Sequence, residues 1–173
     1  MKVLLFGSNG QVGSACRQAF EGEGFELIAL TRSDADFADP ESVYEAVIKY
    51  SPGFVINACA YTAVDKAESE PELAHKVNAL SVASMAKVCN QLDIPCIHIS
   101  TDYVFDGSGI GAYSEASPVA PLGVYGVSKF EGERLLQAEA TKCIILRTSW
   151  VFGVQGNNFV KTMLKLGQER DSL

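Results

Sequence analysis

The sequence predicts an α/β fold in which helices wind on both faces of a parallel β-sheet. Three observations predict it: short apolar runs alternate with helical segments, these runs look buried throughout, and a glycine-rich turn joins the first run to the first helix. Five of the expected strands can be placed, at residues 2–6, 25–30, 54–57, 95–100 and 143–147. We expect the doubly wound order 3-2-1-4-5-6, a sheet of six strands, in one domain over residues 1–173.

The expected helices follow from apolar residues spaced along one face. They cover residues 11–20, a segment that begins after Asp39, residues 71–91, 125–140 and 157–168. Asp39 is the expected N-cap of the second helix, with Pro40 at its first position. The stretch 102–123 is irregular and too long for a plain connection, so we expect it to face a ligand.

Composition excludes several classes of function. Fourteen basic residues against 21 acidic ones give a formal charge of −7, which argues against a general nucleic-acid or anionic-membrane surface. The first apolar run stops at Gly7, too soon for a signal peptide or a membrane span. The five cysteines are odd in number and form no Cys-x-x-Cys pair, so we expect reduced thiols in a cytoplasmic protein. His75 and His98 lie far apart in the sequence, and no metal site is expected.

Residues 7–13 read Gly-Ser-Asn-Gly-Gln-Val-Gly at the first strand-to-helix junction. Gly7 permits a sharp turn, Gly10 lets the backbone approach a pyrophosphate, and Gly13 lets the helix pack closely on the sheet. The helix N-terminus adds free N–H groups and a partial positive charge. The expected cofactor contacts in this turn are therefore Gly7, Asn9, Gly10, Gln11, Val12 and Gly13. The alternative is a plain glycine turn.

The second strand ends near Arg32, where a dinucleotide-binding fold commonly carries a carboxylate for the ribose of NAD. A guanidinium could instead pair with the 2′-phosphate of NADP(H), so we favour NADP(H) over NAD(H). The alternative is a solvated surface arginine.

Three residues are candidates for catalysis. Tyr125 and Lys129 lie four apart at the start of a helix, so their side chains share one face. A nearby ammonium would lower the pKa of the phenol and make it a better proton donor for carbonyl reduction. Thr101, at the carboxyl end of the fourth strand, could hold the carbonyl oxygen beside Tyr125. The alternatives are that Thr101 caps a loop and that Tyr125 only packs.

These residues resemble the extended short-chain dehydrogenase/reductase superfamily and, within it, the dTDP-4-dehydrorhamnose reductase family. The matching stretches run along the chain, at residues 7–13, 36–40, 57–68, 77–78, 100–107, 125–129 and 147–153. The resemblance implies catalytic roles for Thr101, Tyr125 and Lys129. It implies an adenine pocket at Asp36 and Phe37, and contacts on the nicotinamide-ribose side from Ala58, Ala60 and Lys129.

The resemblance also implies a substrate. The implied reaction is the NADPH-dependent reduction of dTDP-4-dehydro-L-rhamnose, and the implied sugar-nucleotide contacts are Thr62, Val64, Asp102, Tyr103 and Trp150. Related 4,6-dehydratases carry Thr-Asp-Glu where this chain has Thr-Asp-Tyr, so the acid–base pair for elimination is incomplete. Asp65 and Glu68 lie in one of the matching stretches. Acidic residues are also favoured at the start of a helix, and this structural role explains them equally well.

Two other functions stay open at this point. One is a non-catalytic dinucleotide-binding protein, like the relatives that serve as the regulatory subunit of methionine adenosyltransferase. The other is a sugar-nucleotide epimerase or dehydratase. Family members are nearer 300 residues long, so we expect a C-terminal part that closes the sugar site to be absent from these 173 residues, and a homodimer is conceivable for the longer protein.

Overall fold

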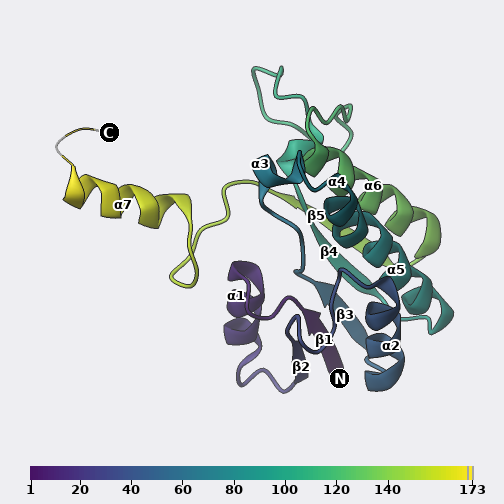
Figure 1. The fold of residues 1–173 in the computed structure, drawn as a ribbon. Coiled ribbons are helices and arrows are strands. Elements are labelled where there is room, and N and C mark those ends of the chain that lie inside the picture. Colours follow the sequence, from purple (N-terminus) through teal and green to yellow (C-terminus); the bar gives the residue numbers. More distant parts are fainter. Residues whose placement is uncertain (171, 173) are drawn as a thin grey trace.

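A computed structural model describes residues 1–170 and 172 of the chain. Its centre is a five-stranded parallel sheet in the order β2-β1-β3-β4-β5 (Figure 1). The strands are β1 (Lys2–Phe6), β2 (Glu26–Leu30), β3 (Phe54–Asn57), β4 (Cys96–Thr101) and β5 (Cys143–Thr148). The predicted α/β class and parallel sheet are confirmed.

The predicted strand order 3-2-1-4-5-6 is wrong in its details. The chain leaves β2 through a loop and a single helix, α2 (Pro40–Tyr50), and adds no strand outside β2. The third strand in chain order therefore pairs with the other side of β1, and the described sheet has five strands. The order in which strands are added to the sheet still reverses beside β1, between β1 and β3. Open α/β sheets form a ligand-binding crevice at such a point.

Most of the remaining helices start close to the predicted positions. They are α1 (Gln11–Phe20), α3 (Val64–Ala67), α4 (Pro71–His75), α5 (Ser81–Gln91), α6 (Val124–Glu139) and α7 (Phe159–Glu169). Asp39 caps α2 as predicted, accepting a hydrogen bond from the Glu41 N–H at 3.2 Å. The short helix α3 lies outside the predicted helices.

The predicted long helix over residues 71–91 is three consecutive pieces. A π-helical turn, Lys76–Leu80, separates α4 from α5. The turn contains Asn78, whose buried amide donates to the Tyr61 carbonyl and the Ser128 hydroxyl and accepts from the Tyr61 N–H. A methyl group on Gly132 of α6 would lie 2.0 Å from the Asn78 carbonyl oxygen, so α6 packs directly on this turn. Such turns are frequent near functional sites.

The two faces of the sheet are covered unequally. Leu4, Phe6 and Val55 point to the face that packs under α2, α5 and α6, whereas Val3, Leu5 and Ile56 point to the face under α1. The α1 face is open over β5, where Ile144 and Leu146 are 54% and 45% exposed. The helix α7 lies away from the sheet and has no buried residue, so the expected coverage of both faces is only partial (Figure 1).

Across residues 1–170 and 172, none of the helices combines the length and apolarity that a membrane crossing requires.

Candidate active site

Two adjoining cavities lie along the carboxyl ends of the strands. The first has a volume of about 450 Å³ and is lined by loop residues that follow β1, β2 and β3 and by residues of the helical segment 64–80. The second, of about 460 Å³, opens beside β4, β5 and α6. The two share Gly10, Ala58, Cys59 and Ala60 in their walls, so one extended ligand could occupy both.

The glycine turn separates the two cavities and has the geometry that an anion cradle requires. Gly7 has a φ of 74°, and a Cβ there would lie 2.7 Å from the Ala58 carbonyl oxygen. A Cβ at Gly13 would lie 2.1 Å from the Gly7 carbonyl oxygen, so only glycine lets α1 approach the turn. Gly10 begins α1 without a side-chain cap, which leaves N–H groups available to a phosphate.

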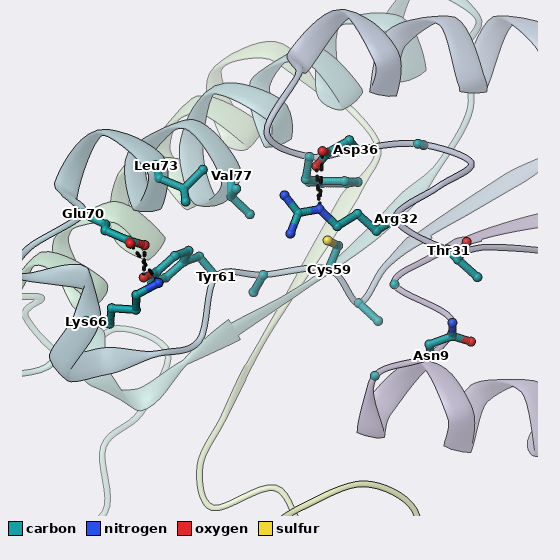
Figure 2. Close-up of a pocket in the computed structure, with 16 residues that line it drawn as sticks. Asn9, Thr31, Arg32, Asp36, Cys59, Tyr61, Lys66, Glu70, Leu73 and Val77 are labelled. Atoms are coloured by element: carbon teal, nitrogen blue, oxygen red, sulfur yellow. Dashed lines mark hydrogen bonds and ion pairs between the residues drawn. The ribbon is translucent and has the colours of Figure 1, made fainter.

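The first cavity contains the predicted residues Arg32, Asp36 and Phe37 (Figure 2). Arg32 has a neighbouring carboxylate that the sequence analysis did not place there: its Nε lies 3.3 Å from Asp36 Oδ1. The turn after β2 brings these two residues, four positions apart, onto the same rim of the cavity. Both side chains are exposed, 79% and 41%, so the pair is weak and the guanidinium remains available to a ligand.

The far end of this cavity contains a group that the sequence analysis missed. The Tyr61 hydroxyl donates to Glu70 Oε2 at 2.7 Å, and Lys66 Nζ lies 2.8 Å from Glu70 Oε1 (Figure 2). These hydrogen bonds lower the pKa of Glu70 and raise the pKa of Lys66. The spacing of Lys66 and Glu70, four residues apart, was a visible signal, but it does not indicate that the pair lines a cavity.

The second cavity brings together the three predicted catalytic residues, Thr101, Tyr125 and Lys129. Tyr125 and Lys129 lie on successive turns of α6, and Thr101 ends β4. Burial raises the pKa of Tyr125, while the neighbouring Thr101 side chain acts in the opposite direction; the Thr101 hydroxyl itself donates to Asp102 Oδ1 at 3.2 Å. The phenol is therefore protonated at neutral pH. It lies beside the Thr101 hydroxyl, so both groups could hydrogen-bond the same ligand atom.

Lys129 does not act on Tyr125 as we expected. Its Nζ donates to the Ile99 carbonyl oxygen at 2.7 Å and lies 3.2 Å from His98 Nε2, beneath the cavity. The side chain is 1% exposed, and burial lowers the pKa of Lys129 to about 8. The expectation of a phenol with a lowered pKa is therefore wrong, because the pKa of Tyr125 is raised and Lys129 does not contribute to the shift.

The same cavity is lined by all five predicted sugar-nucleotide contacts: Thr62, Val64, Asp102, Tyr103 and Trp150. Ser149, which the sequence analysis missed, donates to Asp102 Oδ2 at 2.6 Å and holds this carboxylate at the rim. The Tyr103 ring meets the Tyr125 ring edge-on with centroids 5.4 Å apart. Trp150 has a φ of 52° and is 71% exposed at the mouth of the cavity.

The other predicted cofactor contacts divide between the two cavities. Gly7, Asn9, Gly10, Ala58 and Ala60 line the first, and Gln11 and Val12 line the second. Gly13 lines neither, because it serves the packing of α1 on the turn. Sequence reasoning also missed Cys59, which lines both cavities, although it lies within a stretch that resembles the family.

The chain resembles proteins of known activity over its whole length. It is 49% identical to the dTDP-4-dehydrorhamnose reductase of Escherichia coli K12, an alignment that covers 100% of this chain and 59% of that protein. The crystal structure of a dTDP-4-dehydrorhamnose reductase from Clostridium acetobutylicum matches with a TM-score of 0.96 and 39% identity, over 100% of this chain and 61% of that one.

A third relative was solved with a ligand. The dTDP-4-dehydrorhamnose reductase of Bacillus anthracis, in complex with NADP, matches with a TM-score of 0.93 and 37% identity, over 98% of this chain and 60% of that one. The chain thus spans about three fifths of the length of these relatives. The family model for the RmlD substrate binding domain matches residues 1–173. The chain therefore belongs to the RmlD substrate binding domain family.

Proposed function

We propose that the whole protein reduces the 4-keto group of dTDP-4-dehydro-L-rhamnose to give dTDP-L-rhamnose, with NADPH as the reductant. The observation that carries the proposal is the convergence of Thr101, Tyr125 and Lys129 on one cavity that adjoins a glycine-lined dinucleotide cavity. The activity named for the Escherichia coli relative, at 49% identity, supports the same reaction.

The cofactor fits the residues that are present. The pyrophosphate would bind the free N–H groups at the start of α1, and the adenosine would bind in the first cavity between Arg32 and Phe37. Arg32 would pair with the 2′-phosphate, in agreement with the NADP bound by the Bacillus anthracis relative. When bound, NADPH supplies a hydride to the carbonyl carbon of the substrate.

Tyr125 supplies the proton. Its hydroxyl donates to the carbonyl oxygen as negative charge develops there, and the Thr101 hydroxyl donates a second hydrogen bond that fixes the oxygen. Because burial raises the pKa of Tyr125, the acid form is the one present at neutral pH. Lys129 would bind the nicotinamide-ribose side from below.

The sugar nucleotide binds at the mouth of the second cavity, against Thr62, Val64, Asp102, Tyr103 and Trp150. Tyr103 is 52% exposed and Trp150 is 71% exposed, so the far side of the sugar meets no wall from the described residues. We assign that wall to the part of the relatives that this chain does not cover, with residues 1–173 as the dinucleotide-binding part.

The test is an assay of the whole protein with NADPH and a panel of 4-keto sugar nucleotides. We expect NADPH oxidation with dTDP-4-dehydro-L-rhamnose and formation of the 4-hydroxy sugar. Loss of water from the sugar, or inversion without consumption of NADPH, would instead indicate a dehydratase or an epimerase. Tight dinucleotide binding with no turnover on any member of the panel would indicate a binding protein.

A further inference from the structure

Beneath the second cavity, four polar groups form a row that ends at Lys129. The Cys59 N–H donates to Asn57 Oδ1 at 2.9 Å, and Asn57 Nδ2 lies 3.0 Å from His98 Nδ1. His98 Nε2 in turn lies 3.2 Å from Lys129 Nζ. The side chains of Asn57 and His98 are 0% exposed and that of Lys129 is 1% exposed, so water does not reach the row to satisfy a mismatched group.

The direction of each hydrogen bond in this row follows from the one before it. The Cys59 N–H requires the oxygen of the Asn57 amide, so the NH₂ group of Asn57 faces His98. An NH₂ group only donates, so His98 Nδ1 accepts and the proton of the neutral ring lies on Nε2. This N–H faces Lys129 Nζ, and an ammonium has no lone pair with which to accept it.

We propose that Asn57 and His98 are positioning residues that select the protonation state of Lys129: Asn57 fixes the His98 proton on Nε2, and only the uncharged amine of Lys129 accepts it. The same amine still has N–H groups, one of which donates to the Ile99 carbonyl oxygen at 2.7 Å. Each polar group of the row then has a hydrogen-bond partner. With an ammonium, the His98 Nε2–H and an N–H of Lys129 would face each other as two buried donors without an acceptor.

Burial favours the uncharged amine more strongly than the neighbouring acidic groups favour the ammonium. The titratable groups around Lys129 are Cys59 after β3, His98 on β4, and Tyr125 and Glu133 on α6. Glu133, the only carboxylate among them, is 2% exposed and is bound by Arg147 of β5 at 2.6 Å, so it does not hydrogen-bond Lys129. Burial lowers the pKa of His98, which keeps the ring neutral, and burial lowers the pKa of Lys129 to about 8, so the uncharged amine becomes the main form above about pH 8.

A charged Lys129 must leave His98 for an acceptor in the cavity above, such as a ligand hydroxyl. Binding of a ligand to this amine is therefore accompanied by the uptake of a proton whenever Lys129 begins uncharged. Only this consequence for the cofactor rests on the proposed function. The tautomer of His98 and the titration of Lys129 are properties of the free protein and can be measured without turnover.

The direct test is NMR of the ligand-free protein. The nitrogen shifts of His98 in ¹⁵N-labelled protein distinguish the tautomers, and we expect protonated Nε2 with unprotonated Nδ1. A proton on Nδ1 would overturn the proposal, because Asn57 would then direct nothing. This measurement needs no variant and does not depend on which reaction the protein performs.

Two variants separate hydrogen-bond direction from burial. In His98→Gln a carbonyl oxygen can face Lys129, so we expect Lys129, followed by ¹³C NMR of labelled lysines, to titrate roughly one unit or more higher than in wild type. In Asn57→Asp the carboxylate accepts from Nδ1, which moves the His98 proton and also raises the titration of Lys129. Lys129→Arg removes one lysine signal from the spectrum and thereby identifies the signal of Lys129. An unchanged Lys129 titration in His98→Gln would show that burial alone sets its charge.

Discussion

Gly126 fixes the distance between α6, which carries Tyr125, and the 3₁₀ turn Asp102–Val104 that follows Thr101. A Cβ built at Gly126 lies 2.3 Å from the Tyr103 carbonyl oxygen and 3.0 Å from Pro121 Cβ. Ordinary van der Waals contact begins near 3.4 Å, so Gly126→Ala must move α6 and the Tyr103 turn apart by about 1 Å. The neighbouring atom is backbone, which cannot rotate away as a side chain would.

That displacement changes the relative position of Thr101 and Tyr125, because Tyr125 precedes Gly126 and Thr101 begins the turn. A misplacement of about 1 Å in a reacting group costs on the order of a hundredfold in turnover. The free energy of unfolding should also fall, by about 1–3 kcal/mol for an overpacked contact. The glycine turn at residues 7–13 is not involved, so NADPH affinity should be retained.

The assay compares turnover with the keto sugar, the dissociation constant of NADPH and chemical denaturation for the whole protein and its Gly126→Ala variant. Gly167→Ala in α7 is the matched control, because none of the described residues lies within 4 Å of the added methyl group, and it should keep wild-type turnover. Turnover of Gly126→Ala close to that of the wild type would refute the reasoning that this contact sets the geometry of Thr101 and Tyr125.

Three further predictions follow from the site. Arg32→Ala should weaken NADPH roughly tenfold or more relative to NADH, measured by titration of both cofactors, and an unchanged ratio would remove Arg32 from the 2′-phosphate. Glu133→Gln should lower the free energy of unfolding by about 3 kcal/mol in urea, because it leaves the Arg147 guanidinium without its buried partner, and a neutral outcome would contradict that role. Folding lowers the pKa of Lys129 from 10.5 to about 8, so the unfolded state binds more protons between these values and stability rises with pH across that window. Lys129→Met should remove this rise, which amounts to about 3 kcal/mol; an identical pH profile in the variant would show that Lys129 does not titrate there.

Much of the fold is visible in the sequence because local patterns report it. The strands and most helices follow from apolar periodicity and from caps such as Asp39 and Pro40, which act within a few residues. The strand order depends instead on where the chain crosses after α2, and no local pattern reports that crossing. The π-helical turn at Asn78 likewise depends on its contacts with Tyr61 and α6.

The candidate site likewise contains residues that local motifs predict and contacts that depend on distant parts of the chain. The glycine turn and the Tyr125–Lys129 spacing are local motifs, and the structure brings these residues to the two cavities. The direction of the Lys129 side chain is set by His98 and Ile99 on a strand distant in sequence, so spacing on α6 could not reveal it. The Arg32–Asp36 pair was missed because the path of the loop after β2 determines it.

The most direct test of the proposed function is the turnover of Tyr125→Phe in the whole protein, with NADPH and dTDP-4-dehydro-L-rhamnose. The substitution removes the hydroxyl and keeps the ring, including its edge-on contact with Tyr103. We predict a loss of turnover on the order of a hundredfold or more, with NADPH affinity retained, because the proton donor is gone while the dinucleotide cavity is intact. A variant that oxidises NADPH at a near-normal rate would contradict the assignment of Tyr125 as the acid.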